Sequence, residues 1–436
     1  MFMGPLHHVP SPLVFQLFPW YFEVLVGLGQ SPQRLSDFHR GYGPVFRTGW
    51  RRVMVVSALG AKQMYLDDTF LKSRLYAGFS YFGENLLSQR DPVAHRRRKR
   101  IIGVAFTPSN LKRMEGTIMS SGIVPLLENL RSGGVVNICH QLHCMTWDVM
   151  GELALGGSFG LVRNGHHPAM DWLASVTNAA QVAYLFPFLK YFPSHSLRSL
   201  HNFTRGLLDR PSDHAPIRKA ISSLSPGAIL AESHLMLFGG TDTASNAITF
   251  LLHFLIHHPQ FLEKVTAEID ALPTGQISYK SAQTLAYLTA AIKETLRLLP
   301  PVAGTPLRIV PKGGWSIHGY SIPENTEVGV PTYALHRSPG VWTAPDQFHP
   351  ERWLTKGPAA QELAGAYMPF LMGPFGCIGR GLAWMEMLTV AANLLREFHL
   401  SPISPAKLSL TCDPTLRPKL HQYFVRVDPR QVTSAV

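Results

Sequence analysis

Residues 370–379, which read FLMGPFGCIG, carry the strongest signal in the chain. They place Cys377 in a loop with glycines at positions 373, 376, 379 and 381, just before a predicted amphipathic helix over residues 382–397. Glycine lets backbone N–H groups approach a sulfur atom, and the N-terminus of a helix favours negative charge. Both effects stabilise a thiolate, the form of cysteine that binds soft metal ions. The alternative is a buried free cysteine in a glycine-rich turn.

A single thiolate does not satisfy zinc, so a metal at Cys377 has to bring its other ligands with it, as haem iron does. A second group, Cys139, His140, His143 and Cys144, offers four potential zinc ligands. On a helix Cys139 and His143 share one face, whereas His140 and Cys144 share another. We therefore interpret this group as part of a buried helix.

The longest predicted helix lies in the middle of the chain. Ser225 is a suitable N-cap and Pro226 suits the first helical position. From there to His258 the helix spans about 33 residues, or roughly 50 Å at 1.5 Å per residue. Its apolar part, residues 235–256, contains Asp242, which is costly inside lipid. We expect a buried helix that crosses a large core and not a membrane span.

This helix contains the sequence GGTDT at residues 239–243. Each mid-helix glycine costs roughly 1 kcal/mol, which indicates that something flat or bulky approaches the backbone there. Asp242 and Thr243 then offer an acid and a hydroxyl at this point. The alternative is a kinked core helix in which the threonine bonds back to its own helix.

Two further motifs lie between the central helix and the cysteine loop. Glu294 and Arg297 are spaced i, i+3 and so share one helix face, a common pattern that is uninformative alone. Pro350-Glu351-Arg352-Trp353 follows before the loop, and the order of the three motifs is informative.

The rest of the chain predicts a mainly α fold with a small β portion. A turn at residues 41–44 leads into two short strands, residues 305–332 alternate short strands with Gly and Pro turns, and residues 340–376 are rich in loops. Because no linker divides the chain, we expect one domain over residues 1–436, with a Pro-rich segment at 1–30.

Composition limits the class of protein. Hydrophobic residues make up 46% of the 436 residues and charged residues 16%, which argues against disorder, and four cysteines do not form a disulfide framework. The net charge of +12 suggests acidic partners. The densest basic run, residues 95–100, is accompanied by no nucleic-acid motif, and a solvated helix face is the alternative reading.

Taken in order, these motifs resemble the cytochrome P450 superfamily of haem-thiolate monooxygenases. The sequence from Gly313 to Trp353 looks most like that of fungal members. The resemblance covers nearly the whole chain. Its elements are the first strand entry at 42–45, helix C at 95–106, the oxygen-activating helix at 239–243, the ExxR motif at Glu294 and Arg297, the PERF-like motif at 350–353 and the haem loop at 370–379.

The resemblance implies haem b as cofactor, with Cys377 as axial iron ligand and Phe370, Gly373 and Gly379 in the loop around it. Arg308, His95 and Lys99 match positions that contact the haem propionates. Thr243 would hydrogen bond oxygen during its activation, and Asp242 would relay protons to it. Glu294, Arg297 and Arg352 would form an ion-pair network behind the cysteine loop.

The chain departs from the family pattern in three places. Phe375 stands where Arg or His is usual, so one propionate contact is missing and other cations must compensate. His95 and Lys99 replace the usual Trp and Arg of helix C. The chain also begins near the hinge that normally follows a membrane anchor, and residues 200–228 look compressed. We expect either a protein without an anchor or an incomplete sequence.

The resemblance further implies a hydrophobic small-molecule substrate, such as a terpenoid, steroid, polyketide or alkaloid of fungal secondary metabolism, with O₂ as co-substrate. The expected pocket residues are Phe79, Phe82, Phe238, Val302 and Thr305. Electrons would come from NADPH through a reductase docked on the basic run, with a membrane surface as a possible partner and no nucleic acid.

The expected location is the cytosolic face of the endoplasmic reticulum if an anchor exists, and otherwise the cytoplasm. Two alternatives are a non-oxygenase of the same fold, such as an isomerase or dehydratase, and a truncated haem-free binding protein. Retention of Thr243 and the glycine pair argues against the first, and the intact cysteine loop against the second.

Overall fold

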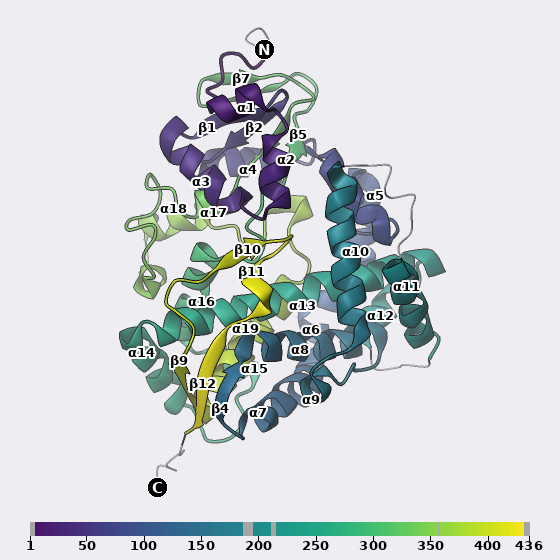
Figure 1. Ribbon diagram of the computed structural model, residues 1–436, viewed down its shortest axis with the longest axis vertical. Helices are drawn as coiled ribbons and strands as arrows, with labels where there is room; N and C mark the ends of the chain where they lie inside the picture. The colour runs from purple at the N-terminus through teal and green to yellow at the C-terminus, as the bar shows by residue number, and fades with distance from the viewer. Residues whose placement is uncertain (1–4, 186–194, 211–214, 356, 431–436) are drawn as a thin grey trace.

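The computed structural model describes residues 5–185, 195–210, 215–355 and 357–430, and it is mainly helical (Figure 1). The α-helices run in chain order as α1 Leu13–Leu17, α2 Tyr21–Gly27, α3 Ser31–Tyr42, α4 Ala58–Leu66, α5 Pro92–Gly103, α6 Pro108–Thr117, α7 Val124–Leu130, α8 Ile138–Met150, α9 Leu161–Asn164, α10 Pro168–Leu185, α11 His195–Leu208, α12 Pro216–Ile221, α13 Pro226–Ile256, α14 Pro259–Asp270, α15 Tyr279–Ala282, α16 Ala286–Leu298, α17 Thr332–Leu335, α18 Pro358–Ala366 and α19 Arg380–Glu397.

An N-terminal lobe forms around a mixed sheet with the strand order β1-β2-β8-β5-β3. Helices α1 to α4 cover this sheet at the top of Figure 1. Apolar residues of both segments, among them Phe46, Met54 and Val328, form one hydrophobic core. The strands are β1 Val45–Gly49, β2 Arg52–Val55, β3 Leu71–Lys72, β5 Arg308–Ile309 and β8 Glu327–Gly329.

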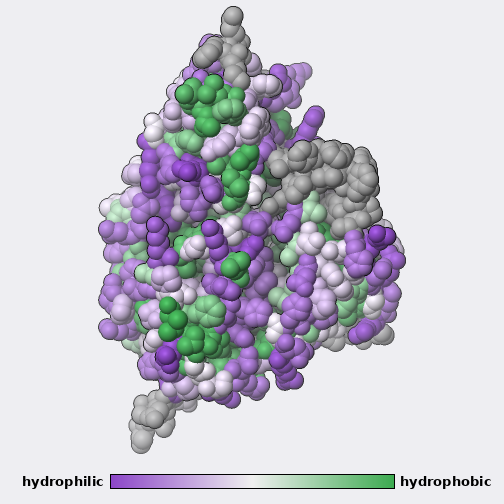
Figure 2. Space-filling model, viewed as in Figure 1, coloured by the Kyte–Doolittle hydropathy of each residue, from purple (hydrophilic) through white to green (hydrophobic). Residues whose placement is uncertain are grey.

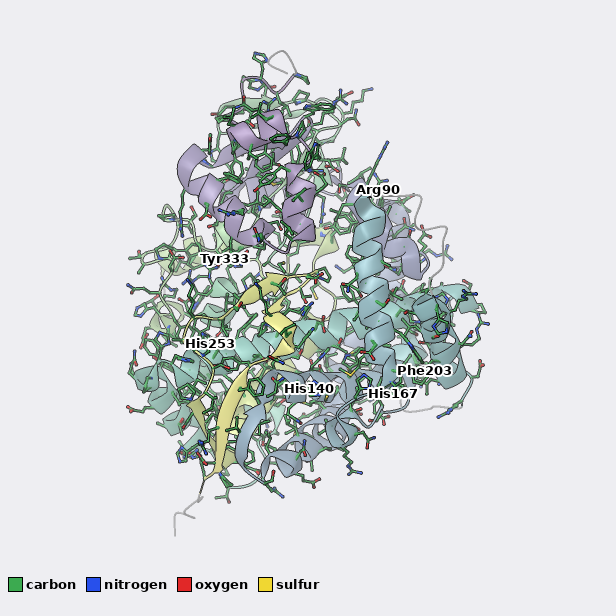
Figure 3. The ribbon with its side chains drawn as sticks, viewed as in Figure 1. Arg90, His140, His167, Phe203, His253 and Tyr333 are labelled. Carbon is green, nitrogen blue, oxygen red and sulfur yellow. The ribbon has the colours of Figure 1, made fainter. Side chains whose placement is uncertain are left out.

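A larger helical body lies below the lobe, and α13 crosses it (Figure 1). Helix α13 packs against α8, α16 and α19, and a second hydrophobic core fills the space between them. His253 on α13, labelled in Figure 3, hydrogen bonds to Tyr423 Oη at 3.1 Å and so joins the central helix to the C-terminal strands.

Small sheets complete the fold. β12 (Phe424–Pro429) pairs with β4 (Gly134–Asn137) on one side and β9 (Phe398–Pro402) on the other. Two hairpins form from β6 (Trp315–Ile317) with β7 (Tyr320–Ile322) and from β10 (Leu410–Cys412) with β11 (Leu416–Pro418). The expected strands of 305–332 are therefore present.

The structure corrects several predicted boundaries. Helix α3 continues through Tyr42, where a turn was expected, and ends at Gly43, whose φ of +86° favours glycine. Helix α18 lies in the region predicted as loops. The central helix begins as predicted, with Ser225 accepting from Ala228 N, but ends at Ile256. None of the described helices is long and apolar enough to cross a membrane.

Candidate active site

The cysteine loop is closed by hydrogen bonds within its own backbone. Cys377 N donates to Phe370 O at 2.9 Å, and Gly376 N donates to Gly373 O at 3.0 Å. Gly373 has a φ of +70°, and a Cβ there would lie 2.0 Å from Tyr65 O on α4. Only glycine fits at this position, so the loop rests directly on the N-terminal lobe.

Cys377 is accessible to solvent, although much of the protein surrounds its thiol. The residue is exposed, but enough protein surrounds it that burial raises the pKa of its thiol. The backbone N–H groups of Gly379 and Arg380 and the cations of Lys99 and Arg380 act in the opposite direction. The N–H groups at the start of α19 lie where the sequence predicted them, but burial outweighs them and raises the pKa of the thiol, so a thiolate at Cys377 stays a prediction.

Lys99 braces the same loop from α5. Its ammonium donates to Pro374 O at 2.7 Å and to Gly376 O at 2.8 Å. Two of its three N–H groups are therefore used on the cysteine loop itself. Lys99 supports the loop as well as supplying positive charge near the sulfur.

Glu294, Arg297 and Arg352 form the ion-pair network that the resemblance implied. Arg297 is wholly buried and forms a bidentate pair with Glu294, with distances of 2.9 and 2.8 Å. Glu294 Oε1 also accepts from Arg352 Nε at 2.9 Å and from His349 N at 3.0 Å. Trp353 Nε1 donates to the other carboxylate oxygen at 2.9 Å.

His336 connects this network to the cysteine loop, which the sequence did not reveal. Its Nδ1 donates to Arg297 O at 3.2 Å, and its Nε2 accepts from Met368 N at 2.9 Å. Met368 stands two residues before Phe370, where the loop begins. Burial lowers the pKa of His336 to about 3, so the ring is neutral and both nitrogens have partners.

The two glycines of the central helix face different surroundings. A Cβ on Gly240 would lie 2.6 Å from Met150 Sδ on α8, so this glycine permits close helix packing. Gly239 is exposed, and a Cβ there would meet nothing within 4 Å. Thr243 Oγ1 donates to Gly239 O at 2.7 Å, the back-bonding that had been considered as an alternative.

Asp242 is directed toward α8 and the C-terminal segment. His143 Nε2 lies 2.8 Å from Asp242 Oδ1, and Thr415 Oγ1 donates weakly to Oδ2 at 3.5 Å. Burial opposes ionisation, but the hydrogen bond and charge of His143, with His421 and Arg417 nearby, hold the pKa of Asp242 below its usual value.

His143 therefore contacts Asp242 on the central helix and is not grouped with the cysteines of α8. Cys144 Sγ lies 3.5 Å from His140 Nε2, on a different side of α8. Among the described residues, no group of three or more metal ligands is placed to hold an ion.

Basic residues gather around the ring of Phe375. Arg308 is 1% exposed and its Nε has no hydrogen-bond partner, and His95 is 3% exposed with an unpartnered Nδ1. Burial and neighbouring cations lower the pKa of His95 to about 3, so it acts as a neutral hydrogen-bonding group and not as a cation. Lys72, which the sequence did not single out, is 3% exposed beside them.

These observations fit a flat anionic cofactor such as haem. The iron of haem requires an accessible thiol, and its ring requires an open backbone such as that of the glycine on the central helix. Its two carboxylates require buried donors without acceptors. Lys99, His95, Arg308 and Cys377 are the residues that would hold it.

The structure describes the side chains of four of the five expected pocket residues. The rings of Phe79 and Phe238 lie 6.0 Å apart, which brings η1 (Arg74–Phe82) against α13. Val302 is 48% exposed, and Thr305 Oγ1 is buried without a partner. The side chain of Phe82 lies outside the described residues.

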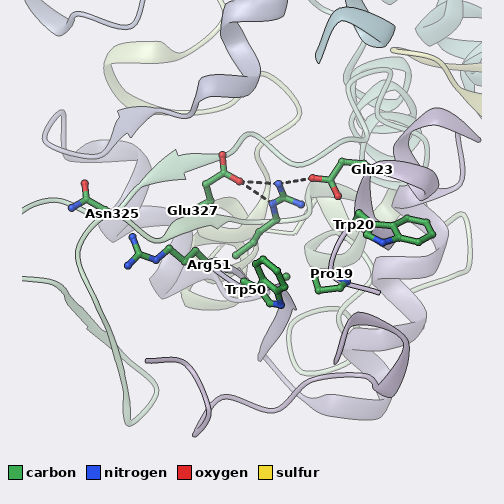
Figure 4. Close-up of a pocket in the computed structure, with 9 residues that line it drawn as sticks. Pro19, Trp20, Glu23, Trp50, Arg51, Asn325 and Glu327 are labelled. Atoms are coloured by element: carbon green, nitrogen blue, oxygen red, sulfur yellow. Dashed lines mark hydrogen bonds and ion pairs between the residues drawn. The ribbon is translucent and has the colours of Figure 1, made fainter. Parts of the chain in front are cut away.

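A separate groove lies on the N-terminal lobe, with a volume of about 400 Å³ (Figure 4). Its base is an ion-pair cluster in which Arg52 bridges Glu23 and Glu327. None of the predicted site residues lines it. Trp20 and Trp50 stand at its rim, 58% and 68% exposed.

These tryptophans belong to an N-terminal apolar patch, which also includes Leu13, Leu17 and Phe18, each about half exposed or more. Figure 2 shows the apolar surface over α1 on this lobe.

Known proteins share both the sequence pattern and the fold. The family described as "Cytochrome P450" matches residues 10–210 and 207–423. Cytochrome P450 monooxygenase FUS8 of Gibberella fujikuroi is 29% identical over 427 residues, covering 91% of this chain and 83% of the relative. Cytochrome P450 monooxygenase notG' of Aspergillus versicolor is 31% identical over 423 residues, covering 91% and 77%. The crystal structure of the cytochrome P450DA heme domain shares the fold, with a TM-score of 0.84 at 20% identity over 97% of this chain and 98% of that one.

Proposed function

Because this chain belongs to the cytochrome P450 family and is a monooxygenase of that family, we propose that Cys377 is the thiolate ligand of its haem iron. We infer further that the enzyme inserts one oxygen atom from O₂ into a hydrophobic small molecule. The observation that carries this proposal is the accessible Cys377 thiol, faced by two backbone N–H groups and by Lys99. When bound, haem supplies the iron that activates O₂, and a thiolate ligand favours O–O cleavage.

The chain's own residues hold the cofactor and manage protons. Lys99 and the hydrogen bonds of the loop keep Cys377 at the end of α19, and Glu294, Arg297 and Arg352 brace the loop through His336. These residues position the ligand and take no part in the chemistry.

Proton delivery falls to Asp242 and Thr243. Thr243 Oγ1 donates its proton to Gly239 O at 2.7 Å, beside open backbone, and would exchange this hydrogen bond for one to O₂. Asp242 receives protons from the side of α8 through His143, and its lowered pKa makes it release them readily.

The substrate is a hydrophobic molecule such as a terpenoid, steroid, polyketide or alkaloid, and the role belongs to fungal secondary metabolism. Phe79, Phe82, Phe238, Val302 and Thr305 form the pocket, and the adjacent rings of Phe79 and Phe238 support this assignment. The catalytic domain comprises residues 1–436.

Electrons come from NADPH through a reductase that docks on α5. The basic run divides by side: Arg96, Arg97 and Arg100 are exposed, whereas His95 and Lys99 turn inward. An exposed basic face attracts an acidic partner and steers its approach.

The N-terminal apolar patch rests on the surface of the endoplasmic reticulum membrane. Exposed tryptophans beside leucines are typical of the interface between lipid and water. This contact requires no spanning helix.

The first test is an absorption spectrum of the dithionite-reduced protein with and without carbon monoxide. A strongly red-shifted Soret band is expected, and Cys377→Ala should abolish it. Cys412→Ala, at a buried cysteine, is the matched control and should leave the band in place.

Two results would contradict the proposal. Haem bound without the shifted band means that Cys377 does not ligate iron, and absence of haem favours a binding role. Substrate-dependent NADPH and O₂ consumption in the reconstituted system then separates a monooxygenase from an isomerase or dehydratase, which need neither.

A further inference from the structure

Three basic side chains, Lys72, His95 and Arg308, meet around the ring of Phe375, and Lys99 donates to the carbonyls of the two residues that flank it. We call these four residues the basic cluster. They come from β3, α5 and β5, which are far apart in the sequence. Lys72 Nζ lies 5.1 Å and Arg308 Cζ 5.0 Å from the centroid of the Phe375 ring, and the His95 ring lies 4.6 Å away.

The basic cluster has no carboxylate of its own. None of its members belongs to an ion pair within the described residues. In the part of the chain that the structure describes, the carboxylate whose charge raises the pKa of Lys72 is Glu232, and it is itself paired with Arg98 at 2.7 Å. Burying charges without a counter-charge is unfavourable, so the cluster needs an anion from outside the chain.

Two buried nitrogen atoms in the cluster also lack hydrogen-bond partners, namely Arg308 Nε, which is a donor, and His95 Nδ1. Arg308 Nη1 is satisfied by Tyr76 Oη at 3.2 Å and Leu307 O at 3.0 Å. A ligand with hydrogen-bond acceptors and negative charge would satisfy Arg308 Nε, and also His95 Nδ1 in the tautomer that carries its proton on that atom. Carboxylates have this chemistry, and haem carries two.

Lys72 is held in position but retains donor capacity. Its ammonium donates to Leu86 O and Leu87 O, both at 2.9 Å, which leaves one of its three N–H groups. Burial, Arg308 and Lys99 lower its pKa to about 7. For Lys72 to be fully charged at pH 7, an anion must therefore lie next to it.

We propose that Lys72 supplies to a haem carboxylate the positive charge that Phe375 cannot, and that the Phe375 ring holds Lys72 and Arg308 side by side by cation–π contact. An aromatic residue at position 375 is thus compensated by a lysine from a two-residue strand some 300 residues earlier in the chain. This inference rests on the proposed haem site at Cys377.

The test measures how fast haem leaves the protein at pH 7 when haem-free myoglobin is added in excess as a scavenger. Loss of one charge-assisted contact should speed haem loss about ten- to hundredfold in Lys72→Met and in Lys72→Gln. Lys72→Gln retains a donor for the Leu86 and Leu87 carbonyls and so serves if Lys72→Met folds poorly. Lys72→Arg keeps the charge and should stay near the wild-type rate.

A double variant separates a haem contact from a merely structural role. In Lys72→Met combined with Phe375→Arg, the new guanidinium restores the missing cation, and haem loss should slow toward the wild-type rate. If Lys72 only tied the 86–87 backbone in place, arginine at 375 would not rescue it.

The outcomes distinguish this inference from the proposed function. A wild-type protein without the red-shifted carbon monoxide band overturns the role of Cys377. A normal band, with haem loss unchanged in both neutral variants or unrescued in the double variant, overturns the role of Lys72 alone.

Discussion

Glu294→Gln should destabilise the protein more than any exposed ion-pair substitution. The carboxylate is fully buried and accepts five hydrogen bonds, from Arg297 Nε and Nη2, Arg352 Nε, His349 N and Trp353 Nε1, at 2.8 to 3.0 Å. Glutamine keeps the size but removes the charge and points an amide at cationic donors.

The magnitude follows from the charges left behind. Arg297 has no exposed surface, and the Arg352 side chain is 8% exposed, so water does not replace the lost partner. Removing one partner of a buried pair costs about 3–5 kcal/mol. The matched control, Glu397→Gln, breaks the Arg131–Glu397 pair at 3.3 Å, in which Arg131 is 61% exposed, and should cost about 0–1 kcal/mol.

The assay is urea unfolding of both variants and the wild type, followed by circular dichroism at 222 nm. Tryptophan fluorescence is less suitable, because Trp353 donates to Glu294 and its signal would change with that hydrogen bond. A loss below about 1 kcal/mol for Glu294→Gln, equal to that of Glu397→Gln, would refute the reasoning that this network holds the segment behind the cysteine loop.

Three further outcomes are expected. Gly240→Ala should be less stable to urea than Gly239→Ala by about 1–3 kcal/mol, because only the former meets Met150; equal stabilities would contradict the packing assignment. The pKa of His336 is lower in the folded than in the unfolded state, so its contribution to stability is present above pH 6.5 and is lost as pH falls toward 3. His336→Gln should therefore remove about 1.4 kcal/mol per pH unit from the slope of the unfolding free energy against pH between pH 6 and 5. An unchanged slope would contradict a neutral, buried His336. Replacing both Trp20 and Trp50 of the N-terminal apolar patch with alanine should reduce co-sedimentation with phosphatidylcholine vesicles several-fold, whereas Leu420→Ala, at an even more exposed site on the C-terminal segment, should not.

Much of the site could be predicted from the sequence because its signals are local. The cysteine loop depends on glycines within a few residues of Cys377 and on the helix that follows. The start of α13 depends on Ser225 and Pro226, and Glu294 and Arg297 share a helix face through their spacing. Each signal arises from backbone geometry over less than two helical turns, which a linear pattern records directly.

Partnerships between distant segments were decided by the tertiary structure. The sequence gives no sign that Asp242 would meet His143, since that contact depends on how α13 packs on α8. His336 linking Arg297 to Met368 likewise follows from the approach of separate segments.

Lys72 shows the same limit most clearly. It lies in a two-residue strand with no motif around it, and its position beside Phe375 results from the pairing of β3 with β5 and from the cysteine loop resting on α4. The family resemblance implied that a positive charge is missing at position 375. Which side chains surround Phe375 was decided by packing, because burial and electrostatics depend on distances in space and not on distances along the chain.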